Sequence, residues 1–215
     1  MSRTPITLVV LMIFSLAAII GAIVLLLVAR FSFAERATFE VNGVELIMEG
    51  VIDGSTPGRL KRALDDNPGL EWIVLDYVPG SANDEANLRA ARMVRDRGLN
   101  TLVPSNAMIA SGGTDFFLAG VERVVEDGAC IGVHSWSGGD VEAEPVDLPR
   151  NHPEHQKYLD FYGAVGIDTD FYWYTLQAAP AEGMHWMSES EMRSYAVGTD
   201  YEPASETDTT RCDDR

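Results

Sequence analysis

The feature that most constrains this chain is an unbroken apolar run near its start. Residues 6–29 are 24 uncharged residues, most of them large and apolar, with Arg3 before them and Arg30 after them. As a helix rising about 1.5 Å per residue, the run would reach about 36 Å, enough to cross the hydrocarbon core of a bilayer. A cleaved signal peptide usually has a shorter apolar region of about 7–15 residues. We therefore expect residues 1–30 to be an uncleaved transmembrane anchor, with cleavage as the alternative.

Composition limits what the rest of the chain can bind. Residues 31–201 are enough for one domain, and residues 202–215 form a polar, acidic tail. The chain has 33 acidic and 16 basic residues, so its net charge is −17 at pH 7. This surplus of negative charge opposes binding to nucleic acids and to anionic lipid surfaces. We expect no nucleic-acid partner.

The two cysteines leave two alternatives open. Cys130 and Cys212 lie far apart in the sequence. They form one disulfide if the domain lies outside the cytoplasm, and otherwise remain two free thiols. No CxxC pair or Cys/His cluster suggests a metal site, so we expect no metal and no cofactor.

The middle of the chain alternates between strand-like and helix-like segments. Short apolar runs between turn residues predict buried strands, and longer amphipathic segments with end signals predict helices. Strands are expected at residues 72–75, 101–103, 123–125 and 130–134, and helices at residues 56–66, 84–97, 153–165 and 170–178. Repeated strand–helix order predicts an α/β domain with a mostly parallel sheet covered by helices.

The segment with the clearest chemical implication is Ser111-Gly112-Gly113, where a helix of small residues is expected to begin. At a helix start, free backbone N–H groups and the positive end of the dipole converge, which favours an alkoxide-like oxygen or an oxyanion. His134 ends an apolar strand 23 residues later, enough chain to return it to Ser111, and Trp136 would then border a substrate. Serine and histidine on separate elements are the minimum for nucleophilic acyl transfer. Alternatively, Ser111 only caps the helix.

Four motifs follow one another in a characteristic order. They are the turn Pro79-Gly80-Ser81, the run Ala110-Ser111-Gly112-Gly113, the strand end Ile131-Gly132-Val133-His134-Ser135 and the segment Trp186-Met187-Ser188-Glu189-Ser190-Glu191-Met192. In this order they resemble the ClpP/crotonase superfamily, specifically small membrane-anchored or periplasmic ClpP-like proteins. The resemblance covers roughly residues 39–199. The local Ala-Ser-Gly-Gly run is also similar to the signal peptide peptidase A family.

This resemblance implies an α/β fold of repeated β-β-α units, a homo-oligomer and a serine peptidase site. In the ClpP pattern the nucleophile corresponds to Ser111 and the general base to His134. The resemblance places the oxyanion donors at the backbone N–H groups of Gly80 and Gly112. The residue types agree with these roles, because backbone donors need glycine or an open turn to aim at one point.

The chain departs from the family pattern in two places. Ser81 stands where the first turn usually has a second glycine, and no carboxylate occupies the place of the ClpP triad aspartate. A histidine base without an orienting partner loses control of its tautomer. Asp168, or else Asp170 two residues later, is the candidate for that partner, and a backbone carbonyl or an asparagine is the alternative. In the signal peptide peptidase A pattern the base is a lysine, and Lys157 would take that role.

The sequence therefore predicts a membrane-anchored, extracytoplasmic serine peptidase that acts on peptides or unfolded segments. Its alternative is a catalytically inactive interaction module of the same fold at the membrane. Crotonase-type chemistry on acyl thioesters is the weakest reading, because an acidic domain without an evident basic patch is poorly suited to binding coenzyme A.

Overall fold

The computed structural model describes residues 36–138, 143–205 and 212. The expected anchor, residues 1–30, lies outside these described residues. Within the described ranges, no helix is both long enough and apolar enough to span a bilayer.

The strands form two sheets. The larger sheet has the order β1 (Thr38–Asn42), β2 (Glu45–Glu49), β3 (Trp72–Leu75), β5 (Asn100–Val103), β7 (Arg123–Glu126) and β10 (Asp200–Glu202). The smaller sheet has the order β4 (Tyr77–Val78), β6 (Met108–Ala110), β8 (Cys130–Val133) and β9 (His185–Trp186). Only the β1–β2 and β8–β9 pairs are antiparallel. The fold is therefore mixed α/β with mostly parallel sheets.

The chain repeats one strand–strand–helix unit. In each repeat the first strand joins the larger sheet and the second joins the smaller sheet, as in β3–β4–α3 and β5–β6–α4. The strands β7 and β8 continue this alternation. Second strands therefore lie side by side in the smaller sheet, and β6 pairs in parallel with β8 so that Ala110 lies opposite Gly132. This register places the residues that follow β6 and β8 at the same edge of the sheet.

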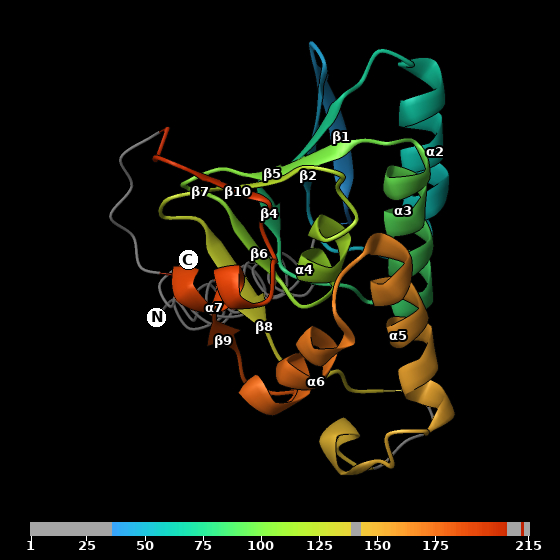
Figure 1. The fold of residues 1–215 in the computed structure, drawn as a ribbon. Helices are drawn as coiled ribbons and strands as arrows, with labels where there is room; N and C mark the ends of the chain where they lie inside the picture. The colour runs from blue at the N-terminus through green and yellow to red at the C-terminus, as the bar shows by residue number, and fades with distance from the viewer. Residues whose placement is uncertain (1–35, 139–142, 206–211, 213–215) are drawn as a thin grey trace, which may run out of the picture. The chain divides into compact units, whose positions relative to one another are not determined.

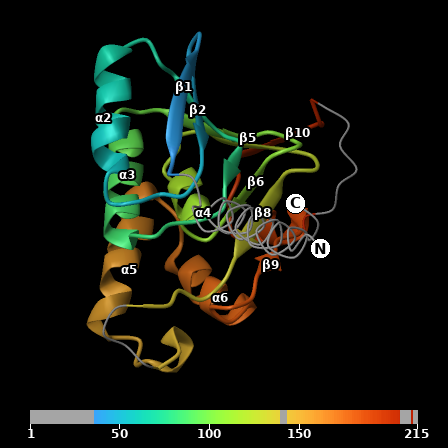
Figure 2. The same ribbon diagram turned by 180° about the vertical axis from the view of Figure 1, so that it is seen from behind.

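The larger helices are α2 (Thr56–Asp66), α3 (Asp84–Asp96), α5 (Pro153–Val165) and α6 (Thr169–Ala178), and the shorter ones are α4 (Gly112–Phe117), α7 (Glu189–Ser194) and the 3₁₀ turn η1 (Pro145–Asp147). The helices α2, α3 and α5 line up along one side of the domain (Figure 1, Figure 2), and in Figure 1 α7 lies apart from them near β9. The short helix α4 contacts α3 as well as β6 and β8. The segment after Ser111 therefore lies in the interior of the domain.

The core forms because the apolar faces of these elements meet. Leu46 and Ile73 point into it from neighbouring strands, and both are fully buried. Phe116 and Phe117 of α4 are also fully buried, so this short helix is held by packing rather than by its length. On α3, Asn83 caps the first turn by accepting a hydrogen bond from the N–H of Ala86 at 2.8 Å.

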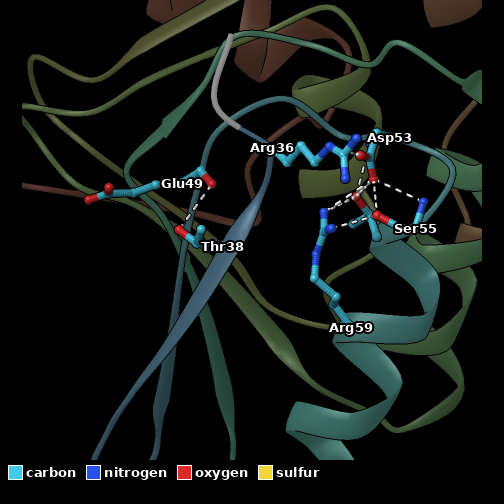
Figure 3. A network of polar contacts seen from close by, with 7 residues as sticks. Arg36, Thr38, Glu49, Asp53, Ser55 and Arg59 are labelled. Atoms are coloured by element: carbon cyan, nitrogen blue, oxygen red, sulfur yellow. Dashed lines mark hydrogen bonds and ion pairs between the residues drawn. The ribbon is translucent and has the colours of Figure 1, made fainter. Parts of the chain in front are cut away.

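The start of α2 is fixed by a polar network around Asp53, shown in Figure 3. The Asp53 carboxylate accepts hydrogen bonds from the Ser55 N–H at 2.9 Å and the Ser55 hydroxyl at 2.7 Å. It also pairs with Arg59 at 3.1 Å and with Arg36 at 3.2 Å. The hydrogen bonds from Ser55, with help from Arg59, lower the pKa of Asp53 to about 2. The network joins the first described residues to α2.

Sequence and structure agree closely on the longer elements. The expected helices at 56–66 and 153–165 have the bounds observed for α2 and α5, and the capping box between Ser188 and Glu191 is formed at the start of α7. Two details differ. A separate short strand, β6, leads into Ser111, and β10 runs through Glu202, so the boundary expected after residue 201 falls inside a strand.

The C-terminal segment is tied to the domain. Cys130 and Cys212 form a disulfide, which decides between the two alternatives left open by the sequence. Buried Arg123 donates hydrogen bonds to the carbonyls of Val197 at 2.8 Å and Ala196 at 3.0 Å. The segment that precedes and forms β10 is therefore an integral part of the larger sheet.

Candidate active site

A small cavity of about 40 Å³ lies where β6 and β8 end. Ser111 and His134, the two residues singled out from the sequence, both line it. The other lining residues are Asp84, Gly112, Thr114, Asp115, Val133, Trp136, Tyr158, Tyr162, Tyr172 and Thr175. The fold thus brings the predicted nucleophile and the predicted base to one cavity.

Ser111 lies on a sharp turn between β6 and α4. Its backbone has φ of 53° and ψ of −124°, a left-handed φ that side-chain-bearing residues rarely adopt. Hydrogen bonds fix the turn: the Ser111 N–H donates to the Gly132 carbonyl at 3.0 Å, and the Thr114 hydroxyl donates to the same carbonyl at 2.8 Å. The Ser111 side chain caps no backbone N–H, so the capping alternative does not describe it. A backbone conformation of this kind costs about 1–3 kcal/mol in a residue with a side chain, and such residues cluster at active sites and ligand-binding segments.

His134 follows β8 directly and is half-buried. Its Nδ1 lies 3.0 Å from the carbonyl oxygen of Ala181. Because a carbonyl can only accept, Nδ1 carries the proton and the lone pair of the neutral ring lies on Nε2. Burial lowers the pKa of His134, which outweighs the opposite effects of the Ala181 contact and of Asp84. The ring is therefore neutral and able to accept a proton at pH 7.

Two glycines bring the first turn against Ser111. Gly80 has φ of +147°, and a Cβ added there would lie 3.4 Å from Cβ and 3.8 Å from Oγ of Ser111. A Cβ at Gly112 would lie 2.4 Å from Oγ of Ser81. Gly112 opens α4, and among the described residues neither its N–H nor that of Gly80 has a hydrogen-bond acceptor. Both groups are available as donors beside the Ser111 hydroxyl.

Aromatic side chains form one wall of the cavity. Trp136 stacks on Tyr158 with ring centroids 6.0 Å apart, and Tyr158 stacks on Tyr172 at 5.3 Å. The indole N–H of Trp136 donates to the Tyr172 hydroxyl at 2.9 Å. Trp136 therefore borders the cavity, as the sequence led us to expect, on a wall supplied by α5 and α6.

Two aspartates in the cavity were not found by sequence reasoning. Asp84, at the start of α3, accepts hydrogen bonds from the hydroxyls of Ser81 and Tyr158, each at 2.6 Å. Asp115, one helical turn after Ser111, accepts from the Tyr162 hydroxyl at 2.7 Å. Burial, with a further contribution from Asp84, raises the pKa of Asp115 to about 7. Neither residue belongs to a motif that would have singled it out in the sequence.

Two other candidates lie elsewhere. Asp168 is exposed and caps α6 by accepting from the Asp170 N–H at 2.9 Å. The structure does not bring Asp168 to His134, whose Nδ1 contacts the Ala181 carbonyl instead. Lys157 is not among the cavity-lining residues, and its Nζ pairs with Glu154 at 3.0 Å. Of the alternatives weighed for orienting the histidine, a backbone carbonyl is the one observed.

The described residues contain no group of three or more His, Cys, Asp or Glu side chains that could hold a metal ion. The chemistry available in the cavity is that of a serine hydroxyl, a neutral imidazole, two carboxyl groups and backbone N–H donors.

Comparisons with known proteins reveal similarity in fold. The sequence matches no protein-family model, and a comparison with curated protein sequences found no match. Among solved structures, a variant of the membrane-bound stomatin-specific protease 1510-N with a substrate peptide aligns over 70% of this chain and 72% of that chain, at 16% identity and a TM-score of 0.47. An enoyl-CoA hydratase from Polaromonas sp. JS666 aligns over 80% of this chain and 72% of that chain, at 12% identity and a TM-score of 0.47. A member of the enoyl-CoA hydratase/isomerase family aligns over 79% and 70% of the two chains, at 13% identity and a TM-score of 0.49.

Proposed function

We propose that this protein is a serine peptidase that hydrolyses peptide bonds in extracytoplasmic peptides or unfolded segments. One observation carries the proposal: Ser111 is held on a strained strand–helix turn in the same cavity as a neutral His134 whose Nε2 is free to accept a proton. A cap or a packing serine has no need of the left-handed backbone at this position.

The residues supply each proton and charge that the reaction needs. His134 takes the hydroxyl proton of Ser111 on Nε2 while Oγ attacks the carbonyl carbon. The N–H groups of Gly80 and Gly112 stabilise the resulting oxyanion. His134 then gives the proton to the departing amine, and a water molecule hydrolyses the acyl-enzyme by the same steps. The Ala181 carbonyl keeps the histidine in the required tautomer throughout.

The setting of the enzyme is part of the proposal. We infer that residues 1–30 anchor the chain in a membrane with the domain on the extracytoplasmic, periplasmic side. The disulfide between Cys130 and Cys212 supports this side, because such bonds persist in oxidising compartments. Assembly into a homo-oligomer rests on the family resemblance alone.

One observation favours the alternative of an inactive interaction module. The partner of His134 is a neutral carbonyl, and a carbonyl stabilises an imidazolium less than a carboxylate does. In that case the cavity would bind a peptide segment without cleaving it.

Labelling with an uncharged fluorophosphonate tests the proposal. The described domain is expressed with its disulfide formed, and adducts are located by mass spectrometry. Wild type should be labelled at Ser111, while Ser111→Ala and His134→Ala should lose the label. The matched control is Ser137→Ala, which removes an exposed serine three residues after His134. Absence of labelling in a folded sample would support the inactive module instead.

A further inference from the structure

The cavity beside Ser111 carries negative charge that no lysine or arginine among its lining residues balances. Its charged groups are Asp84 and Asp115, and its one other titratable nitrogen base is His134, which burial keeps neutral. Carboxyl groups without a basic partner are costly to desolvate, so two of them in one cavity indicate a specific role.

The two carboxyl groups differ in the number of hydrogen bonds that their oxygens accept. Both oxygens of Asp84 accept a hydrogen bond, one from Ser81 and one from Tyr158. In Asp115, Oδ1 accepts from Tyr162, but Oδ2 accepts from no described residue. Asp115 nevertheless keeps partial exposure and lines the cavity. Asp115 therefore brings to the cavity wall a carboxyl group with one oxygen that has no partner among the described residues.

The remaining walls also suit a cation. Tyr158, Tyr172 and Trp136 also line the cavity, and such side chains supply hydrophobic contacts for the methylene groups of a long cationic side chain. The same rings already hold a cation on another side, because Nζ of Lys157 lies 5.2 Å from the Tyr158 ring centroid and 5.8 Å from that of Trp136. That ammonium pairs with Glu154 at 3.0 Å, and Lys157 is not among the residues that line the cavity.

Resting on the peptidase function proposed above, we propose that this cavity receives the side chain of a lysine at the acyl side of the scissile bond, and that Asp84 and Asp115 set this specificity. A volume of about 40 Å³ accommodates a compact ammonium and its last methylene groups. The planar guanidinium of arginine is larger and needs a wider, flat site. The ammonium donates to Oδ2 of Asp115 and lies beside Asp84.

The raised pKa of Asp115 makes the proposed cation binding dependent on pH. Burial and the neighbouring Asp84 raise the pKa of Asp115 to about 7, and a bound ammonium would favour its charged form. Binding of a cation then releases a proton from Asp115, so affinity increases as the pH rises through 7. The other titratable groups on the cavity wall are His134, Tyr158, Tyr162 and Tyr172. Burial lowers the pKa of the histidine and raises the pKa of each tyrosine, so all four side chains stay neutral.

The test compares two peptidyl diphenyl phosphonates that differ only at the residue next to the phosphorus, lysine or uncharged norleucine. Each reacts when Oγ of Ser111 bonds to phosphorus and a phenol departs. At pH 8, wild type should react about 10- to 100-fold faster with the lysine probe, the range expected for one charge-assisted hydrogen bond. Asp115→Asn should lose most of that preference, and Asp84→Asn part of it.

Matched controls separate specificity from folding. Asp96→Asn makes the same change at the exposed far end of α3, about 18 Å along the helix from Asp84, and should keep the wild-type ratio. Because burial already favours the uncharged form at position 115, Asp115→Asn should fold with an unchanged thermal midpoint. Equal rates for both probes in wild type, with Ser111 still labelled by the uncharged fluorophosphonate, would overturn the lysine specificity and leave the peptidase proposal standing.

A binding measurement tests whether the cavity selects a cation, and it does not require that the protein cleaves a substrate. The indole N–H resonance of Trp136, assigned from its loss in Trp136→Phe, is followed while n-butylammonium or 1-butanol is added. Saturable shifts with the ammonium alone, weakened at least tenfold in Asp115→Asn, would support a cation-selective cavity. The same response to both compounds, or to neither, would overturn it.

Discussion

The closest backbone approach in the site gives the sharpest prediction. Gly113, the second residue of α4, packs against the first turn so tightly that a Cβ there would lie 2.3 Å from the carbonyl oxygen of Val78 and 3.3 Å from its carbonyl carbon. Ordinary contacts of a Cβ begin near 3.4 Å. Gly113→Ala must therefore separate α4 from the turn by about 1 Å, because the obstacle is backbone and not a side chain that can rotate.

Two quantities should change together. Overpacking a tight contact of this kind costs about 1–3 kcal/mol in the free energy of unfolding. The turn after Val78 carries Gly80, and α4 begins beside Ser111, so the same separation moves the proposed oxyanion donor away from the proposed nucleophile. A displacement of about 1 Å in a reacting constellation costs about 100-fold in rate.

The matched control is the same substitution at Gly163 in α5. A Cβ there meets no atom within 4 Å, and the residue is exposed. Gly163→Ala should stabilise the domain by about 0.5–1 kcal/mol through higher helix propensity and leave labelling unchanged. Urea denaturation gives the stabilities, and the rate of fluorophosphonate labelling reports the site. Wild-type stability and labelling in Gly113→Ala would refute the close-approach argument.

Three further predictions concern charge and the disulfide. The lowered pKa of Asp53 stabilises the fold above about pH 4, and this contribution is lost as the pH falls toward 2. After a discount for partial solvent exposure, Asp53→Asn should remove about 1–2 kcal/mol of this pH-dependent stability. Urea denaturation at pH 5 and at pH 2 measures the difference. Burial holds the pKa of His134 below 6.5, so the rate of Ser111 labelling should be flat above that pH and decline below it, whereas a rise continuing to pH 10 would contradict a histidine base. The disulfide spans a sequence separation of 82, so Cys212→Ser should lower the free energy of unfolding by about 2–4 kcal/mol, and an unchanged urea midpoint would show that the bond does not constrain the unfolded chain.

The acid-base partners show where sequence reasoning reached its limit. Ser111 and His134 could be paired from the sequence, because their separation of 23 residues is enough for a helix and a strand that return His134 to Ser111. The group that orients His134 could not be predicted from the sequence, because it is the backbone carbonyl of Ala181, and every residue has such a carbonyl. A search for a carboxylate therefore selected Asp168, which instead caps a helix.

The missed aspartates have a similar explanation. An aspartate on an amphipathic helix ordinarily faces solvent, and nothing near Asp84 or Asp115 in the sequence indicates otherwise. Their surroundings come from α5, which delivers the hydroxyls of Tyr158 and Tyr162 from more than 40 residues further along the chain. Burial and pKa are properties of that assembly.

The amino-acid sequence by itself determined the local structure of this protein: the strand and helix segments, the turn at Ser111, the capping box of α7 and the alternation that defines an α/β domain. These features depend on backbone conformational preference and hydrophobic periodicity, which act over a few residues. Only the tertiary structure decided that Cys130 pairs with Cys212, that a carbonyl holds His134 and that two carboxyl groups face the cavity beside Ser111. Those outcomes depend on distances between segments far apart in the sequence, and such distances are set only when the whole core packs.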